Sequence, residues 1–137
     1  MTHQLTLEFS TPGRGTRDIT GEVAKAVAES RVQCGLAHVF VRHTSCSLII
    51  TENADPDVRR DLDTIMQRLV ADGDPACRHQ TEGPDDMAAH GRSVLTDTGL
   101  MVPVGAGRLM LGTWQGIFLW EHRTSAQRRS VVVTILG

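Results

Sequence analysis

Histidine and acidic side chains recur in stretches of this chain that carry little hydrophobic pattern. Three of its six histidines, His43, His79 and His90, lie in polar, turn-rich contexts where burial in a core explains them poorly. If a helix begins near Asp85, then Asp86 and His90 are four residues apart on one helical face and both can reach one ion. His79 can approach the same point from the preceding loop. Such pairs also arise as ordinary surface contacts, and spacing alone favours that interpretation.

Hydroxyl groups follow His43 directly in the sequence. Thr44, Ser45 and Ser47 could hydrogen-bond phosphate or carboxylate oxygens, although Ser and Thr beside His also form ordinary turns. A nucleophilic Ser-His-Asp triad is disfavoured, because the sequence has no Gly-x-Ser-x-Gly elbow and adjacent strand residues face opposite ways. The cluster indicates either an anion-binding turn or a plain turn.

Further polar residues stand at the ends of predicted strands. Glu52 closes an apolar run without an evident capping role, and Glu121 could pair with an arginine across the turn 123–129. Trp114 and Gln115 could offer a stacking face and an amide to a heterocycle, although a tryptophan at strand spacing is more often core. Taken together, these residues predict a polar pocket built from 43–55, 79–90 and 114–129.

The elements that must position these residues follow from hydrophobic periodicity and turn signals. A single α+β domain, residues 1–137, with a mainly antiparallel sheet and two to three helices is expected. The predicted elements are a strand around Leu5–Phe9, a helix from Asp18 or Thr20 to near Gly35, strands 36–41 and 47–51, a helix from Pro56 to about Gly73, a helix from about Asp85 to Leu95, and a meander of runs at 100–104, 109–111, 117–120 and 131–136.

The helix after Asp55 has the clearest pattern, with an N-cap followed by proline at the first helical position. Its apolar residues recur on one face. We therefore expect Leu62, Ile65 and Leu69 to be core. The side chains expected to face solvent are Asp57, Arg60, Asp61 and Gln67.

The composition of the chain limits the classes of partner that it can be expected to bind. The net charge is -2 and basic residues are scattered among acidic ones, which argues against nucleic-acid binding and against a membrane patch. No apolar run approaches the roughly 20 residues that span a bilayer, and residues 1–10 lack a secretory pattern, so we expect a cytoplasmic protein. Three cysteines without a CxxC spacing predict reduced, mostly buried thiols.

Four motifs in order carry a resemblance to a known family. They are His43-Thr44-Ser45-x-Ser47, Glu52-Asn53-Ala54-Asp55-Pro56, His79-x-x-Glu82-Gly83-x-Asp85-Asp86-Met87-x-x-His90, and Gly112-Thr113-Trp114-Gln115-Gly116-Ile117 ending in Glu121-His122-Arg123. Over nearly the whole chain they resemble the YjbQ family, the secondary thiamine phosphate synthases. The resemblance implies an α+β fold, a homotrimer, a histidine-lined pocket with a metal ion, and a weak thiamine phosphate synthase activity that is not the main function.

The resemblance also implies roles for individual residues. It implies catalytic roles for His43, Glu121 and Arg129, and a divalent ion, zinc or magnesium, at His79, Asp86 and His90. The residues expected to bind a small phosphorylated metabolite are Thr44, Ser45, Ser47, Glu52, Trp114 and Gln115. Two alternatives stay open: a metal-dependent hydrolase of a phosphorylated metabolite, and a metabolite-binding protein without catalysis. We expect the pockets to lie at or near subunit boundaries.

Overall fold

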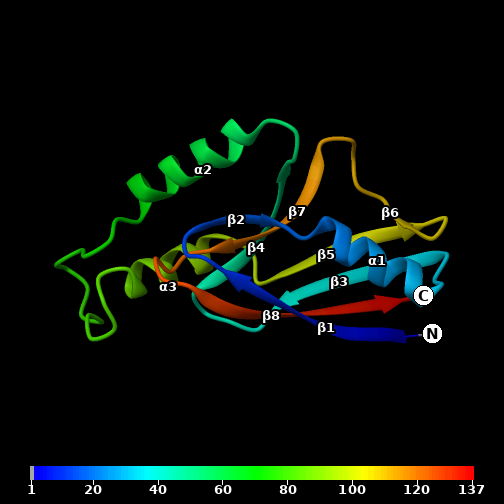
Figure 1. Ribbon diagram of the computed structural model, residues 1–137, viewed down its shortest axis with the longest axis horizontal. Coiled ribbons are helices and arrows are strands. Elements are labelled where there is room, and N and C mark those ends of the chain that lie inside the picture. The colour runs from blue at the N-terminus through cyan, green and yellow to red at the C-terminus, as the bar shows by residue number, and fades with distance from the viewer. Residues whose placement is uncertain (1) are drawn as a thin grey trace.

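Two antiparallel sheets and three helices make up the described residues, 2–137, of the computed structural model (Figure 1). The strands are β1 (Thr2–Thr11), β2 (Gly15–Asp18), β3 (Cys34–Val41), β4 (Cys46–Glu52), β5 (Gly99–Gly105), β6 (Arg108–Leu109), β7 (Gln115–Glu121) and β8 (Gln127–Leu136). The helices are α1 (Thr20–Ser30), α2 (Pro56–Leu69) and α3 (Asp86–Leu95). The expected α+β class with antiparallel sheets is confirmed.

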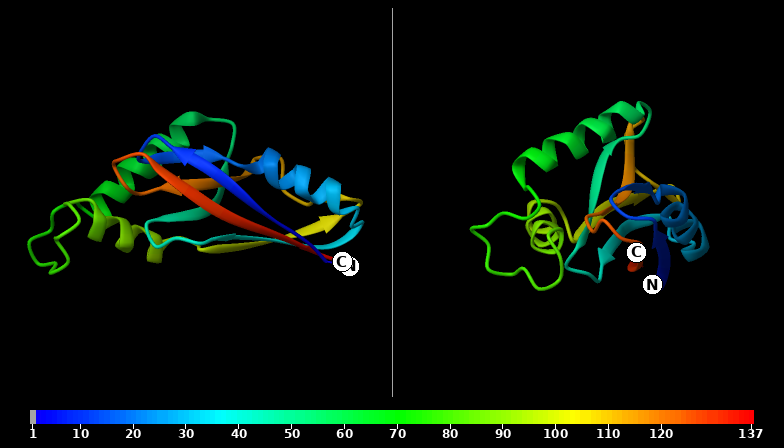
Figure 2. Two further views of the ribbon diagram at one scale, coloured as in Figure 1. Left: turned by 60° about the horizontal axis from the view of Figure 1, so that its bottom comes forward. Right: turned by 60° about the vertical axis from the view of Figure 1, so that its left-hand side comes forward.

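The larger sheet has the order β1-β8-β3-β5-β6 and the smaller one the order β2-β7-β4. Along β8, Val131, Val133 and Ile135 are fully buried and alternate with partly exposed residues, because successive strand side chains point to opposite faces. They pack in one core with residues of the smaller sheet and with the buried face of α1, which includes Val23 and Val27. Figure 2 shows α1 beside the end of the larger sheet at which both termini lie.

The last forty residues do not form the meander that the sequence pattern predicted. β7 pairs with β2 and β4 in the smaller sheet, whereas β8 lies between β1 and β3 in the larger one. The turn 122–126 therefore carries the chain from one sheet to the other. The pattern also missed β2, whose four residues pair with β7 just after the Pro12-Gly13 break.

Strands β4 and β7 separate two groups of candidate residues. Cys46 lies opposite Glu121 at one end of this pair, and Glu52 lies opposite Gln115 at the other. Six residue steps at about 3.3 Å each place the two ends roughly 20 Å apart. We call the first the histidine end (residues 43–45, 79–90, 121–123 and 129) and the second the tryptophan end (Glu52, Trp114 and Gln115). One chain does not bring the two groups together.

The prediction for the face of α2 is wrong in part. Ile65 is 50% exposed and Leu69 is 68% exposed, while Leu62 is only half-buried and Met66 is the buried residue of this helix. The polar residues expected in solvent, Asp57, Arg60, Asp61 and Gln67, are exposed as predicted. The reason is that α2 stands away from the sheets (Figure 1), so its apolar face borders an open groove.

Two smaller expectations concern the cysteines and the membrane. All three cysteines are free, but only Cys46 is buried, since Cys34 is exposed and Cys77 is half-buried. Among residues 2–137, no helix is both long and apolar enough to cross a membrane.

Candidate metal centre and adjoining pocket

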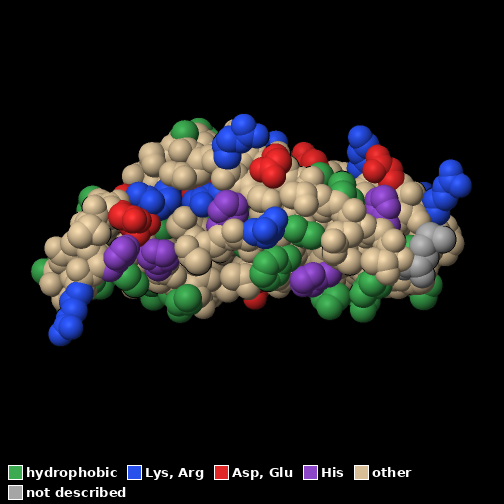
Figure 3. Space-filling model, turned by 90° about the horizontal axis from the view of Figure 1, so that it is seen from below, with side chains coloured by type: hydrophobic (Ala, Val, Ile, Leu, Met, Phe, Trp, Pro, Cys, Tyr) green, Lys and Arg blue, Asp and Glu red, His purple; other side chains and the backbone are tan. Residues whose placement is uncertain are grey.

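His79, Asp86 and His90 converge at the start of α3. The Nε2 atoms of His79 and His90 lie 2.6 and 3.2 Å from the same carboxylate oxygen, Oδ2 of Asp86. One ligand atom from each of the three residues lies within 4.8 Å of the others. Asp86 and His90 are one helical turn apart, and His79 comes from the preceding loop, as the spacing predicted. Figure 3 shows histidine, acidic and basic side chains side by side at this end of the molecule.

This donor set fits a divalent ion. Zinc binds histidine nitrogen and carboxylate oxygen at about 2.0–2.2 Å, so the ligand atoms of a tetrahedral site lie roughly 3.3 Å apart, close to the 3.2 Å between His90 Nε2 and Asp86 Oδ2. The Nδ1 atom of His90 lies 3.2 Å from the carbonyl oxygen of Thr44, to which it can donate its proton. That tautomer leaves the lone pair of His90 Nε2 free for a metal ion, the arrangement common around ligating histidines.

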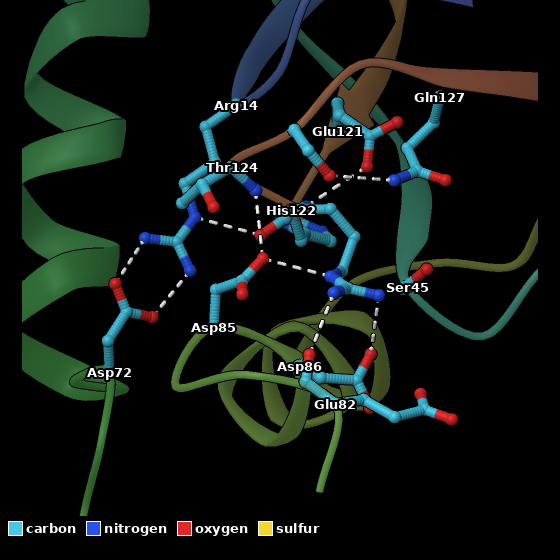
Figure 4. Close-up of polar contacts among 12 residues, drawn as sticks. Arg14, Ser45, Asp72, Glu82, Asp85, Asp86, Glu121, His122, Thr124 and Gln127 are labelled. Atoms are coloured by element: carbon cyan, nitrogen blue, oxygen red, sulfur yellow. Dashed lines mark hydrogen bonds and ion pairs between the residues drawn. The ribbon is translucent and has the colours of Figure 1, made fainter. Parts of the chain in front are cut away.

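Arg123 holds the other side of Asp86. Its Nη1 lies 2.9 Å from Asp86 Oδ1, its Nε lies 2.9 Å from Asp85 Oδ2, and its Nη2 donates to the carbonyl oxygen of Glu82 at 3.1 Å. With Oδ1 held in this way, Oδ2 of Asp86 is left to the two imidazoles. Figure 4 shows Glu82, Asp85 and Asp86 gathered beneath Thr124 of the β7–β8 turn.

Asp85 stands at the N-cap position of α3 but its side chain does not cap the helix. Its carboxylate instead accepts hydrogen bonds from the Nε of Arg123 and the backbone N–H of Thr124, both at 2.9 Å. Burial would raise the pKa of Asp85, but these hydrogen bonds outweigh it and lower the pKa to about 2. The β7–β8 turn therefore fixes the first turn of α3, and with it Asp86.

Glu121 and Arg129 form a buried ion pair next to this centre. They are 1% and 4% exposed. The Glu121 carboxylate accepts hydrogen bonds from Arg129 Nε, Arg129 Nη2, the hydroxyl of Thr11 and the backbone N–H of Arg123. Burial favours the neutral acid, but these donors more than offset it and lower the pKa of Glu121. Arg129 Nη2 also reaches the hydroxyl oxygen of Ser45 at 2.9 Å, which ties the pair to the β3–β4 turn.

His43 joins the ion pair to a cavity of about 450 Å³ lined by His43, Thr44, His90, Ser93, Val94, Thr96 and Thr98. His43 Nε2 accepts a hydrogen bond from the backbone N–H of Ser130 at 2.8 Å, and Arg129 Nη1 lies 3.4 Å from Nδ1. Burial and the neighbouring Arg129 charge lower the pKa of His43, so the ring is neutral near pH 7. Because His90 also lines the cavity, a ligand bound there would lie beside the candidate metal centre.

Ser47 lies apart from the cavity, although the sequence grouped it with Thr44 and Ser45. It is completely buried, and its hydroxyl lies 2.7 Å from His122 Nε2 and accepts a hydrogen bond from Thr96 at 2.6 Å. A ligand therefore cannot reach Ser47 in this conformation. Sequence reasoning did not single out His122, which is 0% exposed and whose pKa burial lowers to about 3.

Comparison with known proteins decides the family. The family model described as UPF0047 protein YjbQ-like matches residues 4–137. The chain belongs to the YjbQ family. A UPF0047 protein of Synechocystis is 50% identical over 98% of this chain and 92% of that protein, and YjbQ of Escherichia coli O157:H7 is 41% identical over 100% of this chain and 99% of that protein.

A solved structure supports the same assignment. A conserved hypothetical protein of Thermus thermophilus is 38% identical, with a TM-score of 0.86 over 96% of this chain and 99% of that chain. The resemblance inferred from the four motifs is thus confirmed at the level of family and fold. None of these names describes an activity.

In this YjbQ-family chain the tryptophan end is less enclosed than the histidine end. Trp114 is 62% exposed, and the side chain of Gln115 accepts a hydrogen bond from the backbone N–H of Gly112 at 2.8 Å. Glu52 accepts one from the backbone N–H of Asp55 at 3.0 Å, a local role at the start of α2. These residues are available to a ligand or partner, but they lie at the far end of the β4–β7 pair from His43.

Proposed function

We propose that this protein is a divalent-metal-dependent enzyme that acts on a small phosphorylated metabolite at the histidine end. The observation that carries the proposal is the convergence of His79, Asp86 and His90 on one point beside a cavity that His90 also lines. Two imidazoles and one carboxylate suit zinc better than magnesium, which prefers oxygen ligands. A bound ion would supply positive charge that stabilises a phosphate oxygen or a leaving group.

The chain's own residues would orient the substrate. Thr44 and Thr98 are exposed hydroxyl-bearing residues on the cavity wall and can donate to an anion. Arg129 contributes a fixed positive charge behind His43. Because all four hydrogen bonds of Glu121 are to neighbouring groups, we assign Glu121 the role of anchoring Arg129 instead of accepting a proton from substrate.

Within this class, the family resemblance leads us to propose weak thiamine phosphate synthase activity as a side reaction. That reaction joins a pyrimidine methylene that bears diphosphate to a thiazole phosphate. Its barrier falls when cations stabilise the departing diphosphate and the pocket holds the two reactants together. A cavity lined by His43 and His90, with Arg129 behind His43 and the candidate metal site at His90, supports such chemistry.

The test begins with metal content. Protein purified without chelator should contain about one divalent ion per chain, and His79→Ala and His90→Ala should each lose most of it with unchanged far-UV circular dichroism. His3→Ala, at the start of β1 and away from the site, is the matched control and should keep its metal. Unchanged metal content in both site variants would overturn the proposal.

Turnover is the second part of the test. Phosphorylated metabolites are screened by thermal shift with and without the ion, and those that stabilise the protein are assayed for consumption. Consumption that depends on the ion supports an enzyme, and thiamine phosphate formation from the two synthase substrates supports the side reaction. A stabilising ligand that is never consumed would instead identify a binding protein.

We also propose that the protein acts as a homotrimer. Two apolar surfaces of one chain remain open. One is a groove of about 320 Å³ whose lining includes Leu62, Ile65 and Leu69 of α2. The other lies on the outer face of the larger sheet, where Leu36, Phe40, Met101 and Leu136 are exposed. Two different patches suit a heterologous contact, which closes into a ring when repeated three times.

Charge placed in the groove tests the trimer. Light scattering should give three chain masses for the wild type and a lower mass for Ile65→Glu or Leu69→Glu, because a carboxylate would be buried without a partner. Gln67→Glu, on the exposed side of α2, should keep the trimer mass. A wild-type protein that stays monomeric across a wide concentration range would overturn this part of the proposal.

A further inference from the structure

Two N–H donors approach the ring of His43. The backbone N–H of Ser130 points at Nε2 from 2.8 Å, and Nη1 of Arg129 lies 3.4 Å from Nδ1. A neutral imidazole has one acceptor nitrogen and one donor nitrogen, so it cannot accept both. The short contact with Ser130 fixes Nε2 as the acceptor. The proton therefore lies on Nδ1 and faces a second donor on Arg129.

Other protonation states do not remove the conflict. A doubly protonated ring would also leave the N–H of Ser130 without its acceptor, and the lowered pKa of His43 opposes that state. A proton on Nε2 would face the backbone N–H of Ser130 across 2.8 Å. That contact between two donors is shorter, and therefore less favourable, than the 3.4 Å contact between Nδ1–H and Arg129.

Arg129 cannot turn its Nη1 to another acceptor without losing its pair. Its Nε and Nη2 are held by Glu121, and Nη2 also by Ser45. Within residues 2–137, the recorded contact of Nη1 is the one with His43. Since Arg129 is 4% exposed, this is a buried donor facing another donor, and buried donors are nearly always satisfied. The arrangement is completed by an acceptor between the two nitrogens.

We propose that His43 Nδ1–H and Arg129 Nη1–H bind one oxygen of a phosphate group that enters from the 450 Å³ cavity, which His43 lines and behind which Arg129 lies. An oxygen about 2.9 Å from each of two nitrogens that are 3.4 Å apart meets ordinary hydrogen-bond lengths. The remaining oxygens of a tetrahedral anion would face the hydroxyl-bearing wall at Thr44 and Thr98. The inference rests on the proposed function for its substrate class, and it makes His43 a phosphate-binding residue, not a proton carrier.

The experiment uses inorganic phosphate and metal-free protein in the presence of EDTA. Long-range ¹H–¹⁵N spectra of the imidazoles should show the His43 proton on Nδ1, and phosphate should shift that resonance in a saturable way. Titration calorimetry gives the dissociation constant. Acetate serves as the carboxylate arm and should bind at least about 10-fold more weakly, because it cannot also reach the hydroxyl-bearing wall.

Two substitutions of His43 test the roles of its two ring nitrogens separately. In His43→Gln the amide can replace Nε2 but leaves nothing at Nδ1, so phosphate affinity should fall about 10-fold or more. In His43→Asn the amide lies near the Nδ1 position and should retain more of the affinity. His3→Gln, at the far end of β1 and off that outer face, is the matched control and should bind phosphate as the wild type does.

Several outcomes would overturn the inference. They are a proton on Nε2 in the wild type, a His43 resonance that phosphate does not move, equal affinity for acetate, and His43→Gln binding phosphate like the wild type. Because the wild-type spectra need no variant, a misfolded substitution leaves the inference testable. The metal content of chelator-free protein is measured separately. It shows whether the proposed metal site is correct even if the proposed phosphate site is not.

Discussion

The histidine end and the tryptophan end differ in how far one chain satisfies its own side chains. At the histidine end, the carboxylates of Asp85, Asp86 and Glu121 are buried and each is held by an arginine. At the tryptophan end, Trp114 is 62% exposed, and the carboxylate of Glu52 is held by a local backbone N–H, that of Asp55. The carboxylates of the histidine end find their partners within one subunit, whereas the tryptophan end presents apolar surface that another molecule can cover.

This difference separates two tasks. Charged groups that do chemistry must be held in place before substrate arrives, since reorganising them during the reaction would cost free energy. The chain therefore encodes their partners itself. Apolar surface needs only a complementary surface to exclude water, which a second copy of the chain supplies equally well. The predictions below change one region while the other serves as the reference.

The largest expected effect is on the Glu121–Arg129 pair. Glu121→Gln removes the charge that compensates a buried guanidinium, and breaking a buried pair in this way costs about 3–5 kcal/mol of unfolding free energy. The reference at the tryptophan end is Glu52→Gln, whose half-buried carboxylate makes one local hydrogen bond and should cost less than about 1 kcal/mol. Denaturant unfolding measures both, and equal costs would mean that the two ends are not different in kind.

Metal affinity gives the next largest effect. Arg123→Gln frees Oδ1 of Asp86 and should weaken metal binding about 10–100-fold, the usual consequence of losing the partner of a metal ligand. Arg14→Gln is the matched control. Arg14 donates hydrogen bonds to Asp72, in the loop after α2, and to the carbonyl oxygen of His122, so it also joins two loops near the site (Figure 4). It contacts none of the three candidate ligands. Competition with a chelating dye measures both. A loss in Arg14→Gln as large as in Arg123→Gln would assign the effect to general loosening.

His122 predicts a pH dependence of stability. Its pKa is about 3 in the fold, compared with 6.5 for a free imidazole, because burial opposes the charged ring. As pH falls below 6.5 the unfolded chain binds a proton that the folded chain does not, so stability falls by up to about 1.4 kcal/mol per pH unit.

In the window from pH 6.5 to 5 ordinary carboxylates remain largely ionised, but His43, whose pKa is also lowered, contributes in the same direction, so comparison with a His122 variant isolates the share of His122. His122→Gln keeps an amide near Ser47 but cannot take up the proton, so its unfolding free energy should depend less steeply on pH than that of the wild type. Urea unfolding at several pH values in this window gives both slopes. Identical slopes would show that His122 is not held neutral by burial.

Local patterns in the sequence account for the convergence of His79, Asp86 and His90. The spacing of Asp86 and His90 predicts their neighbouring positions because one helical turn fixes it, and His79 needs only a loop that folds back on the same turn. The sequence could not choose among Arg123, Arg128 and Arg129 as partners of Glu121. Glu121 accepts hydrogen bonds from the side chain of Arg129 and from the backbone N–H of Arg123. Which arginine uses its side chain depends on how the chain crosses from one sheet to the other.

Burial depends on packing that the local pattern does not contain. Glu121 was expected to pair with an arginine across the turn, and it does, but the pair is buried, with Thr11 of β1 against Glu121 and Ser45 of the β3–β4 turn against Arg129. The opposite error occurred on α2, where an apolar face predicts that something covers Leu62, Ile65 and Leu69 without specifying whether the cover belongs to the same chain. Likewise Ser47 shares a motif with Thr44, but its side chain points to His122 in the interior.

The smallest effect on stability and the sharpest contrast between the two ends come from Trp114. Trp114→Ala should change the unfolding free energy of one chain by less than about 1 kcal/mol, because a side chain that is 62% exposed loses little contact on truncation. If the tryptophan end of one subunit completes the cavity of its neighbour, the same change should weaken binding of a phosphorylated heterocycle about 10-fold by removing a stacking surface. It should leave the affinity for inorganic phosphate unaltered, because phosphate has no ring to stack.

Thermal shift with both ligands, on the assembled protein and on the Leu69→Glu variant, shows whether the tryptophan contact comes from the same subunit or from a neighbour. An effect of Trp114→Ala on the heterocycle that persists in dissociated chains would place the tryptophan contact within one subunit, contrary to the roughly 20 Å that β4 and β7 put between the two ends.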